Sequence, residues 1–153
     1  MVLVKLRRPE EILASGSMID DDIQIRTAFH ISGFGISADE ISSRLGLIPT
    51  STSEDSPLSK KHRASGYVGW ILKPDTDFEF TCESPDDSVQ RVLQLLSGKS
   101  IEIQSLKPEL CAKLVVGVHL STGSFDDLSF SSESLNQMSD LGLDLVLSIV
   151  GHD

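Results

Sequence analysis

The sequence has few of the features that mark membrane-spanning, secreted or metal-binding proteins. No apolar run approaches the roughly 20 residues that a membrane-spanning helix needs, and the apolar stretch at residues 2–6 is too short for a secretory signal. The two cysteines, Cys82 and Cys111, have no second cysteine or histidine at metal-ligand spacing. We therefore expect a cytoplasmic protein with free thiols, no metal and no cofactor.

Positive charge is also scarce. The chain has 13 Lys and Arg residues against 23 Asp and Glu residues, which gives a net charge of −10 and a pI near 4.7. Because binding to a nucleic-acid backbone depends on cations that neutralise phosphates, this balance argues against a nucleic-acid partner. A basic protein is the partner that the charge favours. With 153 residues, of which 39% are apolar, the chain is long enough for one domain, residues 1–153, with its own core.

Periodic patterns predict most of the secondary structure. Alternation of period two predicts strands at residues 25–32, 67–73, 112–121 and 143–150. Capping residues and helical spacing predict helices that begin at Ser37, Ser84 and near Ser131. The remaining expectations are a short helix at residues 9–14, a mobile loop at 50–65, a hairpin partner at 78–82 and an extended linker at 101–106.

The strands alternate too strongly for a parallel sheet between two helical layers, in which strands are continuous apolar runs. We expect an α+β fold in the order β-α-β-α-β-α-β, with a mainly antiparallel sheet and helices on one face. The sequence of residues 118–121 is similar to that of residues 29–32, and the sequence of residues 130–135 is similar to that of residues 36–41. This similarity predicts two diverged half-repeats, residues 23–106 and 107–153, after an N-terminal extension at 1–22. An approximate two-fold axis would relate them, in a ferredoxin-like layering.

Several motifs together resemble an uncharacterised bacterial family, the domain of unknown function 4279. They are the turn and helix start Ile36-Ser37-Ala38-Asp39-Glu40-Ile41, then Leu45-Gly46-Leu47-Ile48-Pro49-Thr50, the lone tryptophan in Gly69-Trp70, and a helix of the 131–141 kind before a last apolar strand. The resemblance covers residue 25 to the end and implies a single small domain. It implies no known activity, cofactor or catalytic residue.

Other motifs have simpler structural interpretations. Residues 33–38 fit the dinucleotide pattern G-x-G-x-x-A, with Glu54 and Asp55 about 20 residues later. However, the preceding strand contains Gln24, Arg26 and His30, and a tight turn with a capping box explains the whole motif. The acidic pairs at 86–87 and 126–127 are expected to be helix caps or loop residues, and the basic run at 60–63 to be solvated surface. No two of the four histidines stand at metal-ligand spacing.

The strongest candidate for chemistry is a pair of histidines. His30 and His119 occupy matching positions of the two half-repeats, and both are predicted to lie on the sheet face away from the helices. If the two-fold brings them together beside Arg26, they could hold an anionic ligand or act as acid and base. The alternatives are that duplication alone preserved them or that they line a subunit interface.

The same open face is predicted to be unusually apolar. It would carry Tyr67, Ile71, Val115, Val146 and Val150, together with Ala28 and Gly117. A solvated sheet face is normally more polar than this, so we expect a second subunit, the N-terminal segment or a partner protein to cover it. Homodimerisation is the simplest of these arrangements.

Two functions follow from these patterns. The first is a non-enzymatic interaction domain that dimerises or binds a basic protein, with a toxin-neutralising immunity role as one analogy. The second is a small hydrolase or ligand-binding protein that uses His30, His119 and Arg26. The distance between the two imidazoles distinguishes them, because a separation above about 8 Å is beyond the reach of concerted acid-base chemistry.

Overall fold

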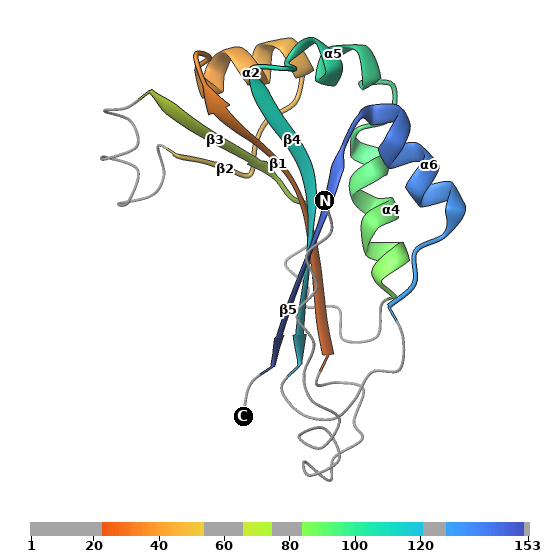
Figure 1. Ribbon diagram of the computed structural model, residues 1–153. Coiled ribbons are helices and arrows are strands. Elements are labelled where there is room, and N and C mark those ends of the chain that lie inside the picture. Colours follow the sequence, from red (N-terminus) through yellow and green to blue (C-terminus); the bar gives the residue numbers. More distant parts are fainter. Residues whose placement is uncertain (1–22, 54–65, 75–83, 121–127, 152–153) are drawn as a thin grey trace, which may run out of the picture.

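The computed structural model describes residues 23–53, 66–74, 84–120 and 128–151. In this part of the chain a five-stranded sheet is covered on one face by helices (Figure 1). The elements are β1 (Ile23–Phe34), α2 (Ala38–Leu45), β2 (Ser51–Thr52), β3 (Tyr67–Leu72), α4 (Pro85–Leu95), α5 (Ser100–Ser105), β4 (Leu110–Leu120), α6 (Ser132–Leu141) and β5 (Asp144–Gly151).

The strands lie in the order β2-β3-β1-β4-β5. The central strand β1 is antiparallel to both β3 and β4, and β2 is antiparallel to β3. Only β5 is parallel to its neighbour, β4. Since α6 lies between β4 and β5 in sequence, the chain can cross back over the sheet and start β5 at the same end as β4. The predicted α+β fold with a mainly antiparallel sheet is confirmed.

One face of the sheet forms the core. Figure 1 views the sheet almost edge-on, with α4 and α6 on one side of β1, β4 and β5. The strand residues on that side are buried, including Phe29, Trp70 and Leu114, which are fully inaccessible. The Trp70 indole meets the Phe29 ring edge-on at 5.9 Å and donates a hydrogen bond from Nε1 to Ser42 Oγ of α2 at 3.0 Å. The predicted alternation therefore identifies the core face correctly.

The three predicted helix starts are confirmed. The hydroxyls of Ser37, Ser84 and Ser131 each accept a hydrogen bond from a backbone N–H three residues later. The helices α2 and α6 end at Gly46 and Gly142, both in the left-handed conformation. No helix in the described ranges is long and apolar enough to cross a membrane.

The expected extended linker at residues 101–106 is wrong, because residues 100–105 form the helix α5. Ile101 and Ile103 stand two residues apart, which suggested an extended chain, but Ile103 and Leu106 are the residues that enter the core. Ile101 is 83% exposed. Side chains of the α5 region also hold the end of α6: Ser100 Oγ and Gln104 Nε2 both donate to Asp140 O at 2.9 Å, and the Lys107 ammonium donates to Gly142 O.

Two further boundaries differ from the expectation. The first strand continues through Gly33 and Phe34, so that only Gly35 remains for the turn, and Ser51–Thr52 pair with β3 as a short strand within the expected loop. The predicted helix at 9–14, the hairpin partner at 78–82 and residues 54–65 of the expected loop lie outside the described residues.

The predicted two-fold relation between the half-repeats is not found. After its helix, the first half continues into β3, which runs antiparallel to β1. After its helix, the second half continues into β5, which runs parallel to β4. A rotation that superimposes β1 on β4 therefore cannot also superimpose β3 on β5. The repeated sequence motifs reflect similar local strand and helix signals rather than equivalent positions in the fold.

Candidate functional site

The candidate site is the sheet face that carries no helix among the described residues, called the open face below. Pairing between strands arranges its side chains in rows that run across the sheet. From β3 to β5 the first row contains Ile71, His30, Lys113 and Asp144, the second contains Ala28, Val115 and Val146, and the third contains Arg26, Gly117 and Ser148. The predicted interface residues Tyr67, Ile71, Val115 and Val146 all lie on this face and are partly exposed.

The structure does not bring His30 and His119 together. On β1 the register partner of His119 is Gln24, whereas the partner of His30 on β4 is Lys113. His30 is six residues along β1 from Gln24, which corresponds to roughly 20 Å at the rise of a strand. Because β1 and β4 are antiparallel, positions near the end of one strand pair with the start of the other, so equivalent sequence positions need not be close. The predicted acid-base pair is therefore wrong in its geometry.

Arg26 lies nearer to His119 than to a site at His30. Its register partner is Gly117, two residues before His119 on β4. Arg26 and His119 each take part in at least one polar, ring or electrostatic interaction. The structure thus places the three predicted ligand-binding residues along the open face without convergence on one point.

His30 has two lysines as its charged neighbours. Burial, Lys113 and Lys73 together lower the pKa of His30 below its ordinary value of 6.5. Lys113 is the cross-strand partner of His30, and Lys73 follows β3 directly. These two lysines could not be predicted from the sequence, because alternation shows which face a residue lies on but not which residues pair across strands. The neighbours favour a neutral imidazole near pH 7.

The middle of the open face is apolar and its border is polar. Ile71, Ala28, Val115 and Val146 belong to four adjacent strands, and Ala28 is 7% exposed. At one end the Phe34 ring, 56% exposed, contacts the Tyr67 ring edge-on at 5.6 Å. Exposed aromatic and branched apolar groups surrounded by charged groups are typical of protein contact surfaces.

The glycine motif has a packing role. A Cβ atom on Gly33 would lie 2.6 Å from Leu110 Cδ2 and 2.9 Å from Glu109 O, so β4 can approach β1 only at a glycine. The strand before the motif is antiparallel to both of its neighbours, unlike the parallel strand that precedes a dinucleotide-binding turn. The structural interpretation of this motif is therefore supported.

The helical layer contains a polar seam between α4 and α6. Gln90 Nε2 donates to Ser134 Oγ at 2.6 Å and to Gln137 Oε1 at 3.3 Å, and Asp86 Oδ1 accepts from Ser131 N at 2.8 Å. Burial raises the pKa of Asp86, but hydrogen bonds from Ser134 and Ser131 outweigh it and lower the pKa below its ordinary value. An open groove of about 420 Å³ lies beside this seam, and its polar groups already bond to one another or face solvent.

A buried side-chain hydrogen bond also joins α4 to the sheet. The hydroxyls of Thr27 and Ser88, both buried, form a hydrogen bond of 2.7 Å between β1 and α4. Each hydroxyl satisfies the other where water has no access. The pair therefore fixes the position of α4 over the central strand.

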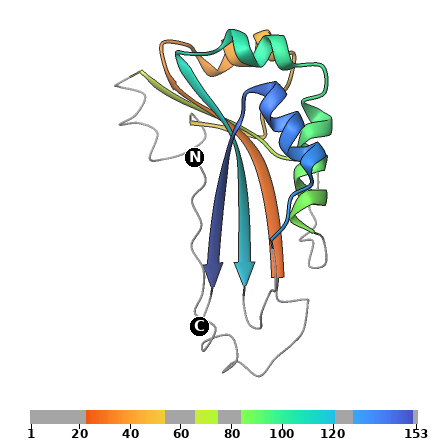
Figure 2. The ribbon, with the colours of Figure 1, turned by 45° about the vertical axis from the view of Figure 1, so that its right-hand side comes forward.

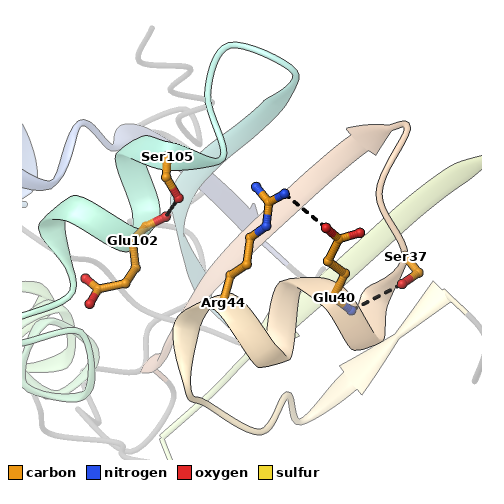
Figure 3. A network of polar contacts seen from close by, with 5 residues as sticks. All are labelled: Ser37, Glu40, Arg44, Glu102 and Ser105. Atoms are coloured by element: carbon orange, nitrogen blue, oxygen red, sulfur yellow. Dashed lines mark hydrogen bonds and ion pairs between the residues drawn. The ribbon is translucent and has the colours of Figure 1, made fainter.

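A third group of polar residues lies on α2 and α5 (Figure 3). Arg44 Nη2 donates to Glu40 Oε1 at 3.0 Å within α2, while the Glu102 carboxylate on α5 points away from Arg44. Glu102 Oε2 is buried and has no hydrogen-bond partner in the described part of the structure. There is no group of three His, Cys, Asp or Glu residues in the described ranges that could hold a metal ion. A single carboxylate does not form a binding site.

The single described cysteine, Cys111, is a free and exposed thiol at the start of β4, in agreement with the expectation for it. Cys82 lies outside the described residues.

Comparison with known proteins gives a family without an assigned activity. No curated protein and no solved structure matches this chain. The family described as "Domain of unknown function (DUF4279)" matches residues 23–152, which includes every helix and strand described above. The chain therefore belongs to the DUF4279 family, as the motifs around Ser37, Gly46 and Trp70 indicated.

Proposed function

We propose that this protein is a non-enzymatic protein-interaction domain whose contact surface is the open face. The observation that carries the proposal is the apolar patch of Ile71, Ala28, Val115 and Val146, which come from four adjacent strands and have no described helix over them. Burying such a patch against a partner gains about 25 cal/mol for each Å² of apolar surface.

The arrangement of the ionisable groups supports binding rather than catalysis. General acid-base chemistry requires two groups within hydrogen-bond reach of one substrate, and the register separates His30 from His119 by roughly 20 Å. The lysines beside His30 also disfavour its protonated form, which an acid catalyst would need.

The charges on the two sides of the molecule suggest different partners. Among the described residues the open face carries Arg26, Lys73 and Lys113 against Asp144, so it suits a partner with both apolar groups and carboxylates. On the helices carboxylates outnumber arginines. The carboxylates are those of Asp39, Glu40, Asp86, Asp87, Glu102, Glu133 and Asp140. A basic protein, the partner that the net charge favours, would meet this helical layer. Neutralisation of a basic toxin is one form that such a complex would take.

The test compares two Glu substitutions of partly or fully exposed apolar residues. Val115→Glu places a carboxylate in the middle of the open face, and Ile101→Glu does so on α5, where the side chain is 83% exposed. Each variant and the wild-type chain are used as bait in an extract of the native host, and captured proteins are identified by mass spectrometry. Each candidate partner is then purified and its Kd for the three chains is measured.

We expect a partner whose Kd is at least about tenfold weaker for Val115→Glu and unchanged for Ile101→Glu. The proposal fails if no captured protein distinguishes the two variants, or if purified candidates bind Val115→Glu as tightly as they bind the wild-type chain. Near-identical circular dichroism of the three chains ensures that lost binding does not reflect lost folding.

A further inference from the structure

The two edges of the sheet differ in how well they are protected against pairing with a strand of another molecule. At one edge, β2 consists of two residues, Ser51–Thr52. At the other edge, β5 pairs with β4 over its full length, from Asp144 to Gly151, and in the described part of the structure no strand lies on its outer side. Figure 2 shows β5 as the outermost of these strands, beside β4 and then β1. Unpaired N–H and C=O groups along such an edge can bond to another strand.

The sequence of β5 lacks the devices that normally prevent this pairing. Its residues are Asp-Leu-Val-Leu-Ser-Ile-Val-Gly, with no Lys and no Pro, and the only charged residue is Asp144 at its start. Its register with β4 is continuous and contains no bulge. Natural proteins usually place Lys, Pro, bulges or very short strands at exposed sheet edges. With none of these four features, β5 has an edge that can pair with another strand.

Partly exposed apolar side chains lie on β5 and on the neighbouring helix α6, on both faces of the sheet. On the open face Val146 is partly exposed and Val150 is 39% exposed. On the helical side Leu145 of β5 is partly exposed, and Leu135 of α6 is 47% exposed.

The position of Leu135 around its helix explains that exposure. Gln137, two residues later, accepts a hydrogen bond from Gln90 of α4, so that side of α6 faces α4. Two residues correspond to about 200° around a helix, so Leu135 is on the opposite side. Leu135 therefore faces away from α4, which packs on β1 and β4, while α6 itself packs on β5.

We propose that two copies of this chain join along β5, with the two strands antiparallel about a two-fold axis, to form one continuous sheet. A second copy is the occupant that the edge itself favours, because an antiparallel pair of identical strands is self-complementary. This arrangement also places the two Asp144 carboxylates at opposite ends of the paired strands, about 20 Å apart, whereas parallel pairing would bring the like charges together.

The apolar groups on both faces supply free energy of association that backbone hydrogen bonds alone do not. A hydrogen bond that replaces one to water contributes little net free energy, so eight residues of strand pairing make a weak contact. Packing of Leu135 and Leu145 against the second copy on one face, and of Val146 and Val150 on the other, adds apolar burial. The open faces of the two copies then lie side by side, so the dimer leaves the proposed partner-binding surface accessible.

The first test measures the mass of the intact chain in solution by light scattering over a range of concentrations. We expect twice the monomer mass of 16.6 kDa. Leu135→Lys and Val150→Lys each introduce an edge-blocking cation and should raise the dimer dissociation constant at least about tenfold, with a larger effect when combined. Ile101→Lys and Ile48→Lys, at positions 83% and 87% exposed elsewhere, are the matched controls and should leave the dimer unchanged.

The second test locates the contact by cross-linking in a Cys82→Ser, Cys111→Ser background. A short bis-maleimide should link Ser148→Cys chains, near the middle of β5, and should not link Thr52→Cys chains, which carry the thiol on β2 at the other edge. Unchanged circular dichroism identifies variants that keep the fold.

Three results would overturn the proposed dimer. One is a monomer at every concentration, and slow hydrogen exchange of the outward β5 amides in that monomer would assign the edge to another segment of the same chain. Another is a dimer that survives both Lys variants. The third is a dimer that Val115→Glu dissociates while the Lys variants do not, which would place the subunit contact on the open face. Because partner capture is measured separately, the edge contact and the open-face function can fail independently.

Discussion

His30 lies on the open face between lysines that come from the strands or strand ends on either side of β1. Neither lysine is close to His30 in sequence, and each reaches it only because β3 and β4 pair with β1. The lowered pKa of His30 is therefore a property of the sheet register, after burial, which is its largest cause.

At the residue scale we predict that Lys113→Met raises the pKa of His30 toward 6.5. Removing the ammonium removes a charge that opposes protonation of the imidazole, while Met retains most of the apolar stem. The shift is measured by following the His30 ring resonances by NMR during a pH titration. Lys99→Met is the control, since Lys99 precedes α5 in the helical layer. A His30 pKa that is identical in wild type and Lys113→Met would contradict the register seen here.

The same shift has a consequence for stability. The folded chain binds a proton at His30 less readily than the unfolded chain, so the unfolded state is favoured as pH falls. The loss of stability begins near pH 6.5, the ordinary value, and is complete below the lowered pKa of the folded state. Lys113→Met should reduce this part of the pH dependence of the free energy of unfolding, measured by urea titration. Above pH 7 His30 is mostly unprotonated in both states, so its titration should contribute little to any difference in stability between the two chains.

At the scale of elements, the junction of α5 and α6 shows how a helix end depends on its neighbours. Gly142 ends α6 with a φ of 71°, and the Lys107 ammonium donates to its carbonyl. Gly98, after α4, has a similar φ of 75° but no atom near the position of an added Cβ. At Gly142 an added Cβ would meet Lys107 Nζ at 3.1 Å.

We predict that Gly142→Ala destabilises the protein more than Gly98→Ala does. Both variants force alanine into the left-handed region, which costs roughly 1–2 kcal/mol. Only Gly142→Ala also displaces Lys107 from the end of α6. The free energies of unfolding from urea titrations of the two variants measure the difference, and equal losses would show that the Lys107 contact contributes nothing.

At the scale of the whole molecule, one core connects both halves of the chain. Trp70 of β3 contacts β1 and α2, while α4 packs on β1 and β4 and contacts α6. Because β1 belongs to both sets of contacts, the region around Trp70 and the region around α6 cannot unfold independently of that strand.

We therefore predict a single cooperative transition. Trp70 is the only tryptophan, so its emission reports the β3 side of the sheet, whereas far-UV circular dichroism reports all helices. Urea midpoints from the two signals should agree within error. Midpoints that differ would indicate that the sequence halves fold as separate units, as the expected half-repeats would allow.

The candidate site shows where sequence-based prediction stops. Tyr67, Ile71, Val115 and Val146 were assigned to the correct face, since side chains alternate along any strand. His30 and His119 were assigned to the correct face but to the wrong distance, since their separation depends on the register between β1 and β4. Lys73 and Lys113, the neighbours of His30, could be found only from the registers of β1 with β3 and with β4.

The sequence by itself determined the local elements: the helix caps at Ser37, Ser84 and Ser131, the stops at Gly46 and Gly142, and the core side of each long strand. These depend on hydrogen bonds and periodicities within a few residues. Only the tertiary structure decided that β5 is parallel to β4, that residues 100–105 form a helix and that β5 is the outermost strand at one edge of the described sheet. Those features arise from contacts between segments far apart in the chain, whose free energies no short stretch of sequence contains.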